Sequence, residues 1–294
     1  MSQLLEGLVI SHLGKGIAVE SAGKIVLCQS RRRLATAAVG DRVRWHLSAP
    51  GQGCIEEILP RRSLLTRPSR SDKVRPVAAN IDTVFVVFAL EPPCDFLLVD
   101  QYLAVCENRN IEVGLIFNKI DLGQSETLEI ELSNYQALGY MIYRVSAAKQ
   151  TGLEQLRQAL KNQTSILAGQ SGVGKSSLTN ALIPDKDVKT ATLSEATKHG
   201  RHTTTAATLY HLPEGGNLID SPGVAIFGLA NLNEQELAYG FREFQSLLDR
   251  CLFNDCKHVK DKGCAVRLAA ETGEISMNRY QRFLKLREKM PPSR

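Results

Sequence analysis

The chain has no long hydrophobic run. None of its apolar stretches approaches the roughly 18 residues that a membrane-spanning helix requires. The first residues, MSQLLEGLVISHLGKG, also lack the basic segment and the apolar core of a secretory signal peptide. We therefore expect no export signal and no membrane partner.

Cysteine is sparse and unevenly placed. The chain has seven cysteines, an odd number, of which four are scattered and three are bunched near the C-terminus. Secreted disulfide frameworks use even numbers at regular spacings, so the pattern favours a reducing cytoplasm. With 294 residues, of which 23% are charged, the chain is large enough for two or three domains of a soluble globular protein.

The modest net charge of +5 hides an uneven distribution. Counting Lys and Arg against Asp and Glu, residues 1–75 carry +7, residues 76–250 carry −7 and residues 251–294 carry +5. One interpretation is a polyanionic partner held by the two basic ends. The other is an ordinary solvated surface, and charge alone does not separate them.

Residues 1–68 are predicted to form a small RNA-binding barrel. Five strand-like segments are separated by turns that contain Gly or Ser: GLVIS, GIAVES, GKIVLCQS, DRVRWHL and GCIEEIL. Five short, evenly spaced strands favour an OB-type β-barrel, a fold that commonly binds oligonucleotides. The runs RRRL and PRRSLLTRPSR supply positive charge there. The stretch LTRPSRSDKVRPVAAN is rich in Pro, Ser and charge and is typical of a linker.

Residues 69–228 are predicted to form an α/β domain. The run IDTVFVVFAL is continuously apolar, as expected of a strand buried on both faces of a parallel sheet. Further strand-like runs then alternate with segments of helical spacing. Residues 229–294 are predicted to be helical. They contain a group of Cys and His residues and end in the basic helix SMNRYQRFLKLREKM.

A phosphate-binding loop is the strongest motif. GQSGVGKS, residues 169–176, matches G-x-x-x-x-G-K-[ST] in full, between an apolar strand and a helix. Its backbone N–H groups are expected to bind phosphate oxygens, Lys175 to bridge the β- and γ-phosphates, and the Ser176 hydroxyl to ligate Mg²⁺. A Gly-rich turn is the alternative, but a chance match is on the order of one percent. The predicted nucleotide-binding residues are Gly169, Gln170, Ser171, Gly172, Val173, Gly174, Lys175, Ser176 and Ser177.

A candidate guanine-binding motif, NKID, follows the buried strand VGLIF. The Asp121 carboxylate can accept from both the N1–H and the 2-amino group of guanine, and adenine offers neither donor in that geometry. Asn118 is expected to tie the base edge to neighbouring loops, and the stem of Lys119 to pack on the ring. A motif of four residues, of which Ile120 is variable, is weak evidence alone. The probability that it occurs by chance in a chain of this length is roughly a few percent.

Three further segments have the local context of a GTPase site. DSPG follows an apolar run, so Asp220 is expected to hold Mg²⁺ through water and the Gly223 N–H to meet the γ-phosphate. In VSAAKQTGL, the backbone of Ser146 and Ala147 is expected to contact the guanine carbonyl. In GRHTTT, one of residues 203–205, assigned here as Thr204, is expected to complete the Mg²⁺ site.

These motifs occur in an unusual order. The chain runs guanine motif, SA loop, phosphate loop, TTT and DSPG, whereas an ordinary GTPase begins with the phosphate loop and ends with the SA loop. The two orders are one cyclic series cut at different points. At these residues the sequence resembles the circularly permuted GTPases. With the barrel and the Cys/His group, it is similar over nearly its whole length to the family of ribosome small subunit-dependent GTPases A (RsgA/YjeQ).

The resemblance implies a slow GTPase that is strongly stimulated by the small ribosomal subunit and acts late in the assembly of that subunit. It implies GTP and GDP as ligands, Mg²⁺ with GTP, binding to 16S rRNA, and a monomeric cytoplasmic protein. The cut also leaves Gly223 only 28 positions before Cys251. We therefore hypothesise that the γ-phosphate switch acts directly on the C-terminal domain.

The glutamine that positions water in many GTPases is missing. The residue after Gly223 is Val224, which cannot orient a water molecule, so slow intrinsic hydrolysis is expected. His202, in GRHTTT, is the best candidate to substitute, because a histidine can hydrogen-bond water near neutral pH. The family resemblance implies the same catalytic role. A solvent-facing loop histidine remains the alternative.

The spacing C-x4-C-x-H-x5-C predicts a closed zinc site. Three thiolates and one imidazole suit tetrahedral Zn²⁺, and four protein ligands make the site structural rather than catalytic. The predicted ligands are Cys251, Cys256, His258 and Cys264. The family pattern agrees with this spacing. Unlinked buried thiols are the alternative.

The sequence therefore favours a GTP-hydrolysing assembly factor that binds ribosomal RNA through its barrel and its C-terminal zinc-binding domain. One alternative is an RNA-binding scaffold in which nucleotide is only a structural ligand. A second is an ATPase or small-molecule kinase with a phosphate loop.

Overall fold

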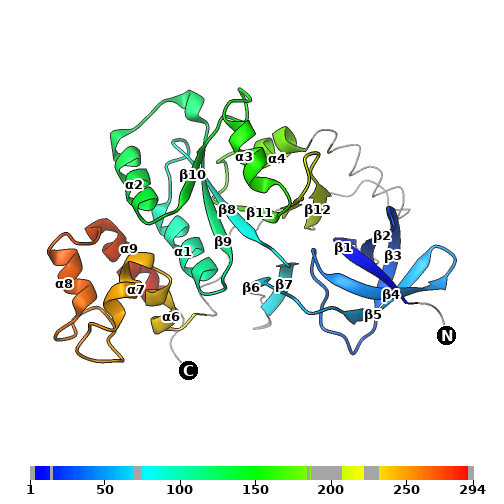
Figure 1. Ribbon diagram of the computed structural model, residues 1–294, viewed down its shortest axis with the longest axis horizontal. Coiled ribbons are helices and arrows are strands. Elements are labelled where there is room, and N and C mark those ends of the chain that lie inside the picture. Colours follow the sequence, from blue (N-terminus) through cyan, green and yellow to red (C-terminus); the bar gives the residue numbers. More distant parts are fainter. Residues whose placement is uncertain are drawn as a thin grey trace.

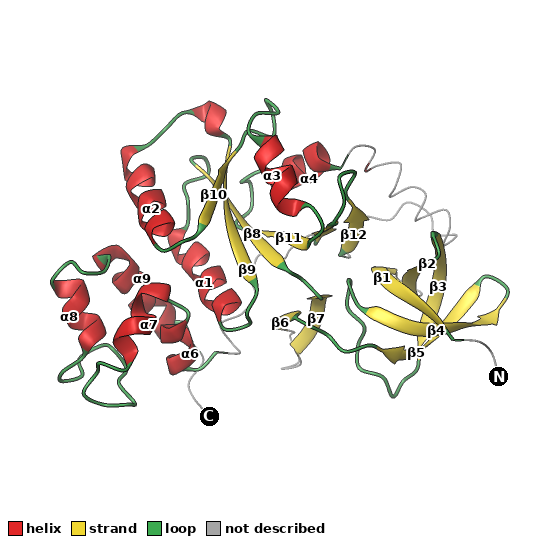
Figure 2. Cartoon of the chain, viewed as in Figure 1, coloured by secondary structure: helices red, strands yellow, loops and turns green. Residues whose placement is uncertain are grey.

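The computed structural model describes residues 4–13, 16–68, 74–183, 186, 207–221 and 232–290 (Figure 1). A small barrel at the N-terminal end, a central α/β domain and a group of C-terminal helices follow one another along the chain (Figure 2). None of the helices within these residues is long and apolar enough to span a membrane.

The N-terminal barrel has five strands, as predicted. They are β1 (Leu5–Leu13), β2 (Gly16–Ser21), β3 (Lys24–Ser30), β4 (Arg42–Ala49) and β5 (Gln52–Ile58). The strand order β1-β2-β3-β5-β4 closes because β1 also pairs with β4. Val9, Val19, Cys28, Trp45 and Ile55 fill the interior. The alternation of these apolar residues with exposed ones is the pattern of a half-buried barrel strand.

The predicted linker is a hairpin rather than an extended connection. It consists of β6 (Leu64–Pro68) and β7 (Val74–Ala79), which pair antiparallel. Its Leu65 and Ala78 are buried, and the side chain of Asn80 donates to the Gly40 carbonyl of the barrel. The local composition did not predict this hairpin, because the residues that bury and stabilise it are distant in the sequence.

The central sheet has the strand order β10-β9-β8-β11-β13-β12. The five strands from β10 to β13 are parallel, as predicted, but β12 is antiparallel to β13. A tight turn joins β12 to β13, with Gly215 and Gly216 at positive φ, and a turn this short requires antiparallel strands. The strands are β8 (Thr83–Ala89), β9 (Glu112–Asn118), β10 (Met141–Arg144), β11 (Thr164–Ala168), β12 (Thr208–His211) and β13 (Asn217–Asp220).

The barrel and the central sheet are continuous. Ser11 of β1 pairs with Thr208 of β12, and their hydroxyls are 3.1 Å apart. His211 Nε2 also lies 2.6 Å from Glu20 Oε2 of the barrel. The barrel thereby covers the edge of the central sheet at Thr208, where β12 begins.

Helices cover both faces of the central sheet (Figure 2). Along β8, Val84, Val86 and Phe88 pack with α1 and α2, whereas Phe85 and Val87 pack with α3 and α4. This burial on both faces explains the uninterrupted apolar run of the strand. The helices are α1 (Phe96–Glu107), α2 (Glu126–Ala137), α3 (Leu153–Leu160) and α4 (Lys175–Leu182).

The C-terminal helices pack on one another, and the first and last of those described also pack against α1. They are α6 (Glu234–Tyr239), α7 (Arg242–Leu248), α8 (Ala265–Glu271) and α9 (Met277–Glu288). The helical pattern before Cys251 is interrupted at Gly240, where an added Cβ would lie 2.5 Å from Ala104 Cα of α1. Only glycine permits this close approach between the two backbones.

Candidate nucleotide and zinc sites

The phosphate loop connects β11 to α4. Gly169 has φ +133°, and a Cβ there would lie 2.1 Å from the Val87 carbonyl oxygen of the neighbouring strand. Gly174, at φ +92°, directly precedes α4, and a Cβ there would clash with the amide of Asn118. Both glycines are therefore required by close approach and by left-handed backbone. Lys175 and Ser176 lie in the first turn of the helix, where backbone N–H groups are unpaired.

The Lys175 ammonium lies inside the loop. Its Nζ donates to the carbonyl oxygens of Gly169 at 2.8 Å and Gln170 at 2.7 Å. Burial lowers the pKa of Lys175, and the nearby Asp220 carboxylate opposes that shift. The loop thus holds the half-buried Lys175 ammonium with the Asp220 carboxylate nearby. A bound phosphate would place further negative charge beside this ammonium.

Asn118 joins three of the predicted loops. It is the last residue of β9 and is buried, and its Nδ2 donates to the Val173 carbonyl of the phosphate loop at 2.9 Å. Its Oδ1 accepts from the Ala147 amide at 3.2 Å. The Asn118 side chain therefore joins the guanine motif to the phosphate loop and to the SA loop, which contains Ser146 and Ala147.

Asp121 is exposed but held in place. Its Oδ1 accepts a 2.5 Å hydrogen bond from the Ser146 hydroxyl, which in turn accepts from the Lys149 amide at 3.1 Å. The Ser146 hydroxyl lowers the pKa of Asp121, so the carboxylate stays ionised and able to accept from a base edge. Lys119 has φ +61°, and its Nζ donates to the Glu91 carbonyl at 2.8 Å.

Asp220 ends β13 and faces a lysine. Its Oδ2 lies 2.6 Å from Lys186 Nζ, so a cation occupies one carboxylate oxygen in this structure. Asp220 and Ser176 remain candidate Mg²⁺ ligands by the chemistry of their oxygens. His202, Thr204 and Gly223 lie outside the described residues.

The described candidate residues share one edge of the sheet. Asn118, Gly169 and Asp220 stand at or directly after the carboxyl ends of β9, β11 and β13, and Ser146 follows β10. Ligands of open parallel sheets bind at this edge. The sequence interpretation missed the neighbouring loop at residues 90–95, which contacts Lys119 and Gln170. The signal for it was its position directly after the buried strand β8.

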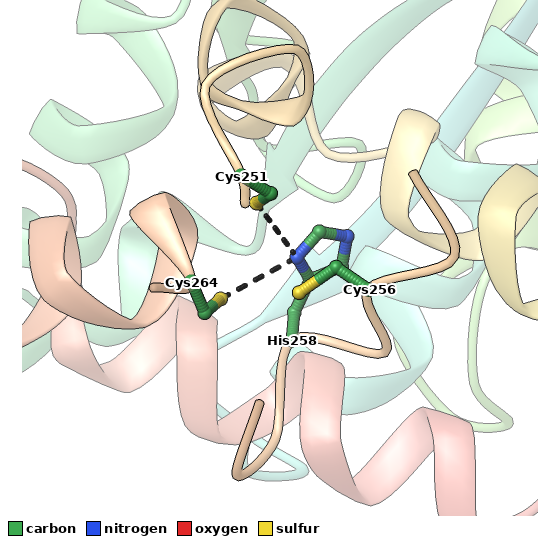
Figure 3. A group of neighbouring side chains, drawn as sticks. All are labelled: Cys251, Cys256, His258 and Cys264. Atoms are coloured by element: carbon green, nitrogen blue, oxygen red, sulfur yellow. Dashed lines mark hydrogen bonds between the residues drawn. The ribbon is translucent and has the colours of Figure 1, made fainter. Parts of the chain in front are cut away.

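Four candidate zinc ligands meet in the C-terminal domain (Figure 3). The ligand atoms of Cys251, Cys256, His258 and Cys264 all lie within 4.8 Å of one another. His258 Nδ1 is 3.6 Å from Cys251 Sγ and 3.5 Å from Cys264 Sγ, and its ring is directed between them (Figure 3).

The surrounding elements fix these ligands. The Cys264 sulfur caps α8 by accepting from the Arg267 amide, and the Tyr280 hydroxyl of α9 donates to the His258 carbonyl at 2.8 Å. Burial raises the pKa of Cys256 to about 12 and lowers the pKa of His258. Three thiols and an imidazole at these spacings fit a tetrahedral, closed Zn²⁺ site.

The C-terminal domain is joined to the central domain by buried ion pairs. Asp100 of α1 accepts from Arg279 Nη1 and from Arg282 Nε, both at 2.5 Å. Arg282 also pairs with Glu131 of α2, and Arg279 pairs with Glu243 of α7. The Arg279 side chain is 1% exposed and that of Arg282 is 12% exposed. These two cations of the basic helix therefore serve the domain interface and are closed to an external polyanion.

Comparison with known proteins gives one consistent result. The RsgA GTPase family model matches residues 58–230. The Small ribosomal subunit biogenesis GTPase RsgA of Hahella chejuensis is 43% identical, over 97% of this chain and 84% of its own length. Its counterpart in Actinobacillus pleuropneumoniae serotype 5b is 42% identical, over 98% of this chain and 86% of its own length.

Two solved structures share the fold. Thermotoga maritima YjeQ is 33% identical with a TM-score of 0.80, over 99% of this chain and 100% of its own. YloQ, described as a circularly permuted GTPase, is 28% identical with a TM-score of 0.75, over 99% of this chain and 98% of its own. The circular permutation expected from the order of the motifs is thereby confirmed.

Proposed function

The chain belongs to the RsgA GTPase family and is a GTPase, and we propose that it hydrolyses GTP at the edge of the central sheet during late maturation of the small (30S) ribosomal subunit. The relatives in Hahella and Actinobacillus are named for biogenesis of that subunit. The proposed ligands are GTP and GDP, the proposed partner is the subunit with its 16S rRNA, and the proposed form is a cytoplasmic monomer. The domain limits 1–68, 69–228 and 229–294 remain predictions.

One observation carries the nucleotide assignment. Asn118 holds the phosphate loop and the SA loop together, while Ser146 of the latter orients the Asp121 carboxylate. A carboxylate fixed in this way accepts from two donors of guanine and repels the acceptor atoms that adenine presents. This arrangement supports a guanine nucleotide over the ATPase and kinase alternatives.

The phosphates and their metal have residues of the right chemistry nearby. Lys175 is proposed to exchange its two carbonyl partners for phosphate oxygens, which gain more from a cation than neutral carbonyls do. Ser176, Asp220 and Thr204 would hold Mg²⁺, and the Gly223 amide would meet the γ-phosphate. The metal supplies charge neutralisation between the phosphates when it is bound. Lys186 must leave Asp220 for this site to form.

His202 is proposed to orient the attacking water. Val224 stands in place of the usual glutamine, and its side chain has no polar atom for that purpose. A subunit that completes the placement of this histidine would make hydrolysis slow in the chain alone and faster on the subunit. The stimulation expected from the family resemblance follows from this arrangement.

The Zn²⁺ site is proposed to be structural. Cys251, Cys256, His258 and Cys264 fill all four tetrahedral positions, which leaves no place for a substrate. Its proposed role is to fix the short loops between α7 and α8, because these loops have few buried apolar residues of their own.

The proposed rRNA contacts use the exposed cations. Arg32 and Arg33 of the barrel are exposed and form no ion pair within the described part of the chain. In contrast, Arg31, Arg42 and Arg44 pair with barrel glutamates. On α9, Lys285 and Lys289 are exposed. Unpaired exposed cations bind a phosphate backbone with little loss of internal interactions.

The test is GTP hydrolysis by the full chain with and without purified small ribosomal subunits, at two salt concentrations. Stimulated turnover that weakens at the higher salt is expected, because counterion release makes RNA binding salt-dependent. The paired variant Arg32→Ala/Arg33→Ala should weaken subunit binding and reduce the salt slope, while Arg44→Ala serves as the matched control. Subunit binding without any stimulation of hydrolysis would favour the scaffold alternative.

A further inference from the structure

Helix α1 touches the phosphate loop near its beginning. The side chain of Gln170 bridges to the segment just before the helix: its Oε1 accepts from the Asp95 amide and its Nε2 donates to the Pro93 carbonyl, both at 2.9 Å. Tyr102 is fully buried on α1, where burial raises the pKa of its hydroxyl and the Gly169 backbone, which lies against that hydroxyl, opposes the rise. Two consecutive residues of the phosphate loop are thus attached to this helix.

The same helix carries the C-terminal domain. Asp100 binds Arg279 and Arg282 of α9, and its Oδ1 also accepts from the Tyr135 hydroxyl at 2.6 Å. At the end of α1, the Asn108 side chain donates to the Glu236 carbonyl of α6 at 2.7 Å. In Figure 1, α1 lies between the sheet and helices α6, α7 and α9. Asp100 and Tyr102 are two positions apart, so their side chains leave the helix on nearly opposite sides, and α1 presents one face to each set of contacts.

We propose that α1 couples the nucleotide site to the zinc-binding domain, with Tyr102 and Gln170 as positioning residues at the phosphate-loop end. The coupling concerns the guanine-nucleotide site proposed above and rests on it. The earlier hypothesis connects the γ-phosphate to this domain through the segment that contains Gly223. The route proposed here is helix α1, and all of its contacts lie within the described residues.

Coupling needs two arrangements of the phosphate loop. Lys175 provides them, because its ammonium can bind either the loop carbonyls or a phosphate. In this structure its Nζ is bonded to the carbonyls of Gly169 and Gln170, the same two residues that lie against α1 and the segment before it. Phosphate competes for this ammonium, because a charged acceptor forms the stronger hydrogen bond. Nucleotide therefore changes the hydrogen bonding of the two residues to which Tyr102 and the segment before α1 are attached.

The buried ion pairs make α9 move with α1. Asp100, Arg279 and Arg282 are almost fully removed from water, so a shift of α1 that separates Asp100 from both arginines leaves its carboxylate without a compensating charge. Close-packed interiors also deform little. A shift of α1 is thus passed to α9, and from there to the zinc site through the bond between Tyr280 and His258.

The test is amide hydrogen exchange of α9 in the full zinc-loaded chain, with and without GDP and Mg²⁺. GDP should slow exchange within residues 277–288 by about fivefold or more, the lower end of ordinary coupling between sites. Tyr102→Phe removes only the hydroxyl and should reduce that effect to about twofold or less. Tyr143→Phe is the matched control, since its half-buried ring lies on β10 against Phe85, and it should keep the full effect.

A second variant probes the other end of the helix. Arg282→Lys keeps a positive charge beside Asp100 but loses the two-pronged contact with Glu131, and it should also reduce the GDP effect on α9. GDP binding is measured separately by calorimetry. If GDP binds but slows α9 exchange equally in the original chain and in Tyr102→Phe, or does not slow it at all, the coupling through α1 is wrong. If GDP does not bind, the proposed nucleotide site fails as well.

Discussion

The Asn118 side chain donates a 2.9 Å hydrogen bond to the carbonyl oxygen of Val173, which joins the guanine motif to the phosphate loop. These residues are far apart in the sequence and stand in the reverse of the usual order. They meet at one edge of the sheet, because β9 and β11 lie on either side of β8 and end at that same edge. The permutation therefore changes the connections and leaves this contact available.

Asn118→Ala should destabilise the central domain by about 2–3 kcal/mol, since a buried carbonyl and a buried amide both lose their partner. Urea unfolding followed by a probe in the central domain measures the effect. Asn180→Ala, on the exposed side of α4, is the control and should change stability by less than about 0.5 kcal/mol. Equal stability of both variants would contradict the bridging role of Asn118.

Asp121→Asn should weaken GDP binding by about 100-fold, because the loss of charged acceptors for two guanine donors costs roughly 3 kcal/mol. Xanthosine diphosphate carries a carbonyl in place of the 2-amino group, so the new amide should bind it better than the original carboxylate does. Calorimetry with both nucleotides measures the exchange of preference. Unchanged GDP affinity would remove Asp121 from base recognition.

His202→Ala should keep GTP binding and lose subunit-stimulated hydrolysis by about 100-fold or more, the range expected for a group that positions or activates water. Single-turnover hydrolysis on saturating subunits measures the chemical step, and nucleotide titration checks binding. Retained stimulation would assign the water to another group.

Cys251→Ala should abolish stoichiometric zinc, because three remaining ligands bind the metal much more weakly than four. Metal analysis of the purified protein, with thermal unfolding of the C-terminal helices, measures both consequences. Cys54→Ala changes a partly buried cysteine of the barrel and should retain zinc. A chain without zinc whose Cys251→Ala variant is fully stable would indicate unlinked thiols.

Glu131 should make the domain interface sensitive to acid. Burial raises its pKa, but the hydrogen bonds and charge of Arg282, with Asn278 and Arg279, lower it below the usual 4.5 overall. A carboxyl with a depressed folded pKa stabilises the fold above its unfolded pKa and loses that contribution as the pH falls through the folded value. Asp100 and Tyr135 face the same two arginines.

Stability of the chain should therefore fall as the pH drops below about 4.5, and Glu131→Gln should show a smaller drop over that window. Urea unfolding at pH 7 and pH 3.5 provides the measurement. Glu126→Gln, an exposed change at the start of α2, is the control and should behave like the original chain. An identical loss in Glu131→Gln would exclude this carboxyl as the source.

Much of the candidate site could be predicted from sequence because its residues act through local backbone. The phosphate loop requires glycines at Gly169 and Gly174 and a helix that begins at Lys175, and each requirement is written in consecutive letters. The candidate zinc ligands could be listed from the sequence for the same reason, because they are closely spaced along the chain. Likewise, the five barrel strands follow from alternation and turns.

Other features depend on partners that the local pattern does not contain. The basic run of α9 looked like an RNA-binding surface, yet Arg279 and Arg282 are neutralised by carboxylates on α1, α2 and α7. The hairpin at β6 and β7 and the pairing of β12 with β1 likewise need surfaces from elsewhere in the chain.

The sequence by itself determined the residue types of the loops and the cyclic order of the motifs, because each candidate site for phosphate, guanine or zinc consists of residues at short spacing. Only the tertiary structure decided which charges are buried and which helix connects the two sites. Burial and long-range pairing are set by the packing of distant segments, and that packing placed Asp100 and Tyr102 of one helix between the phosphate loop and the zinc-binding domain.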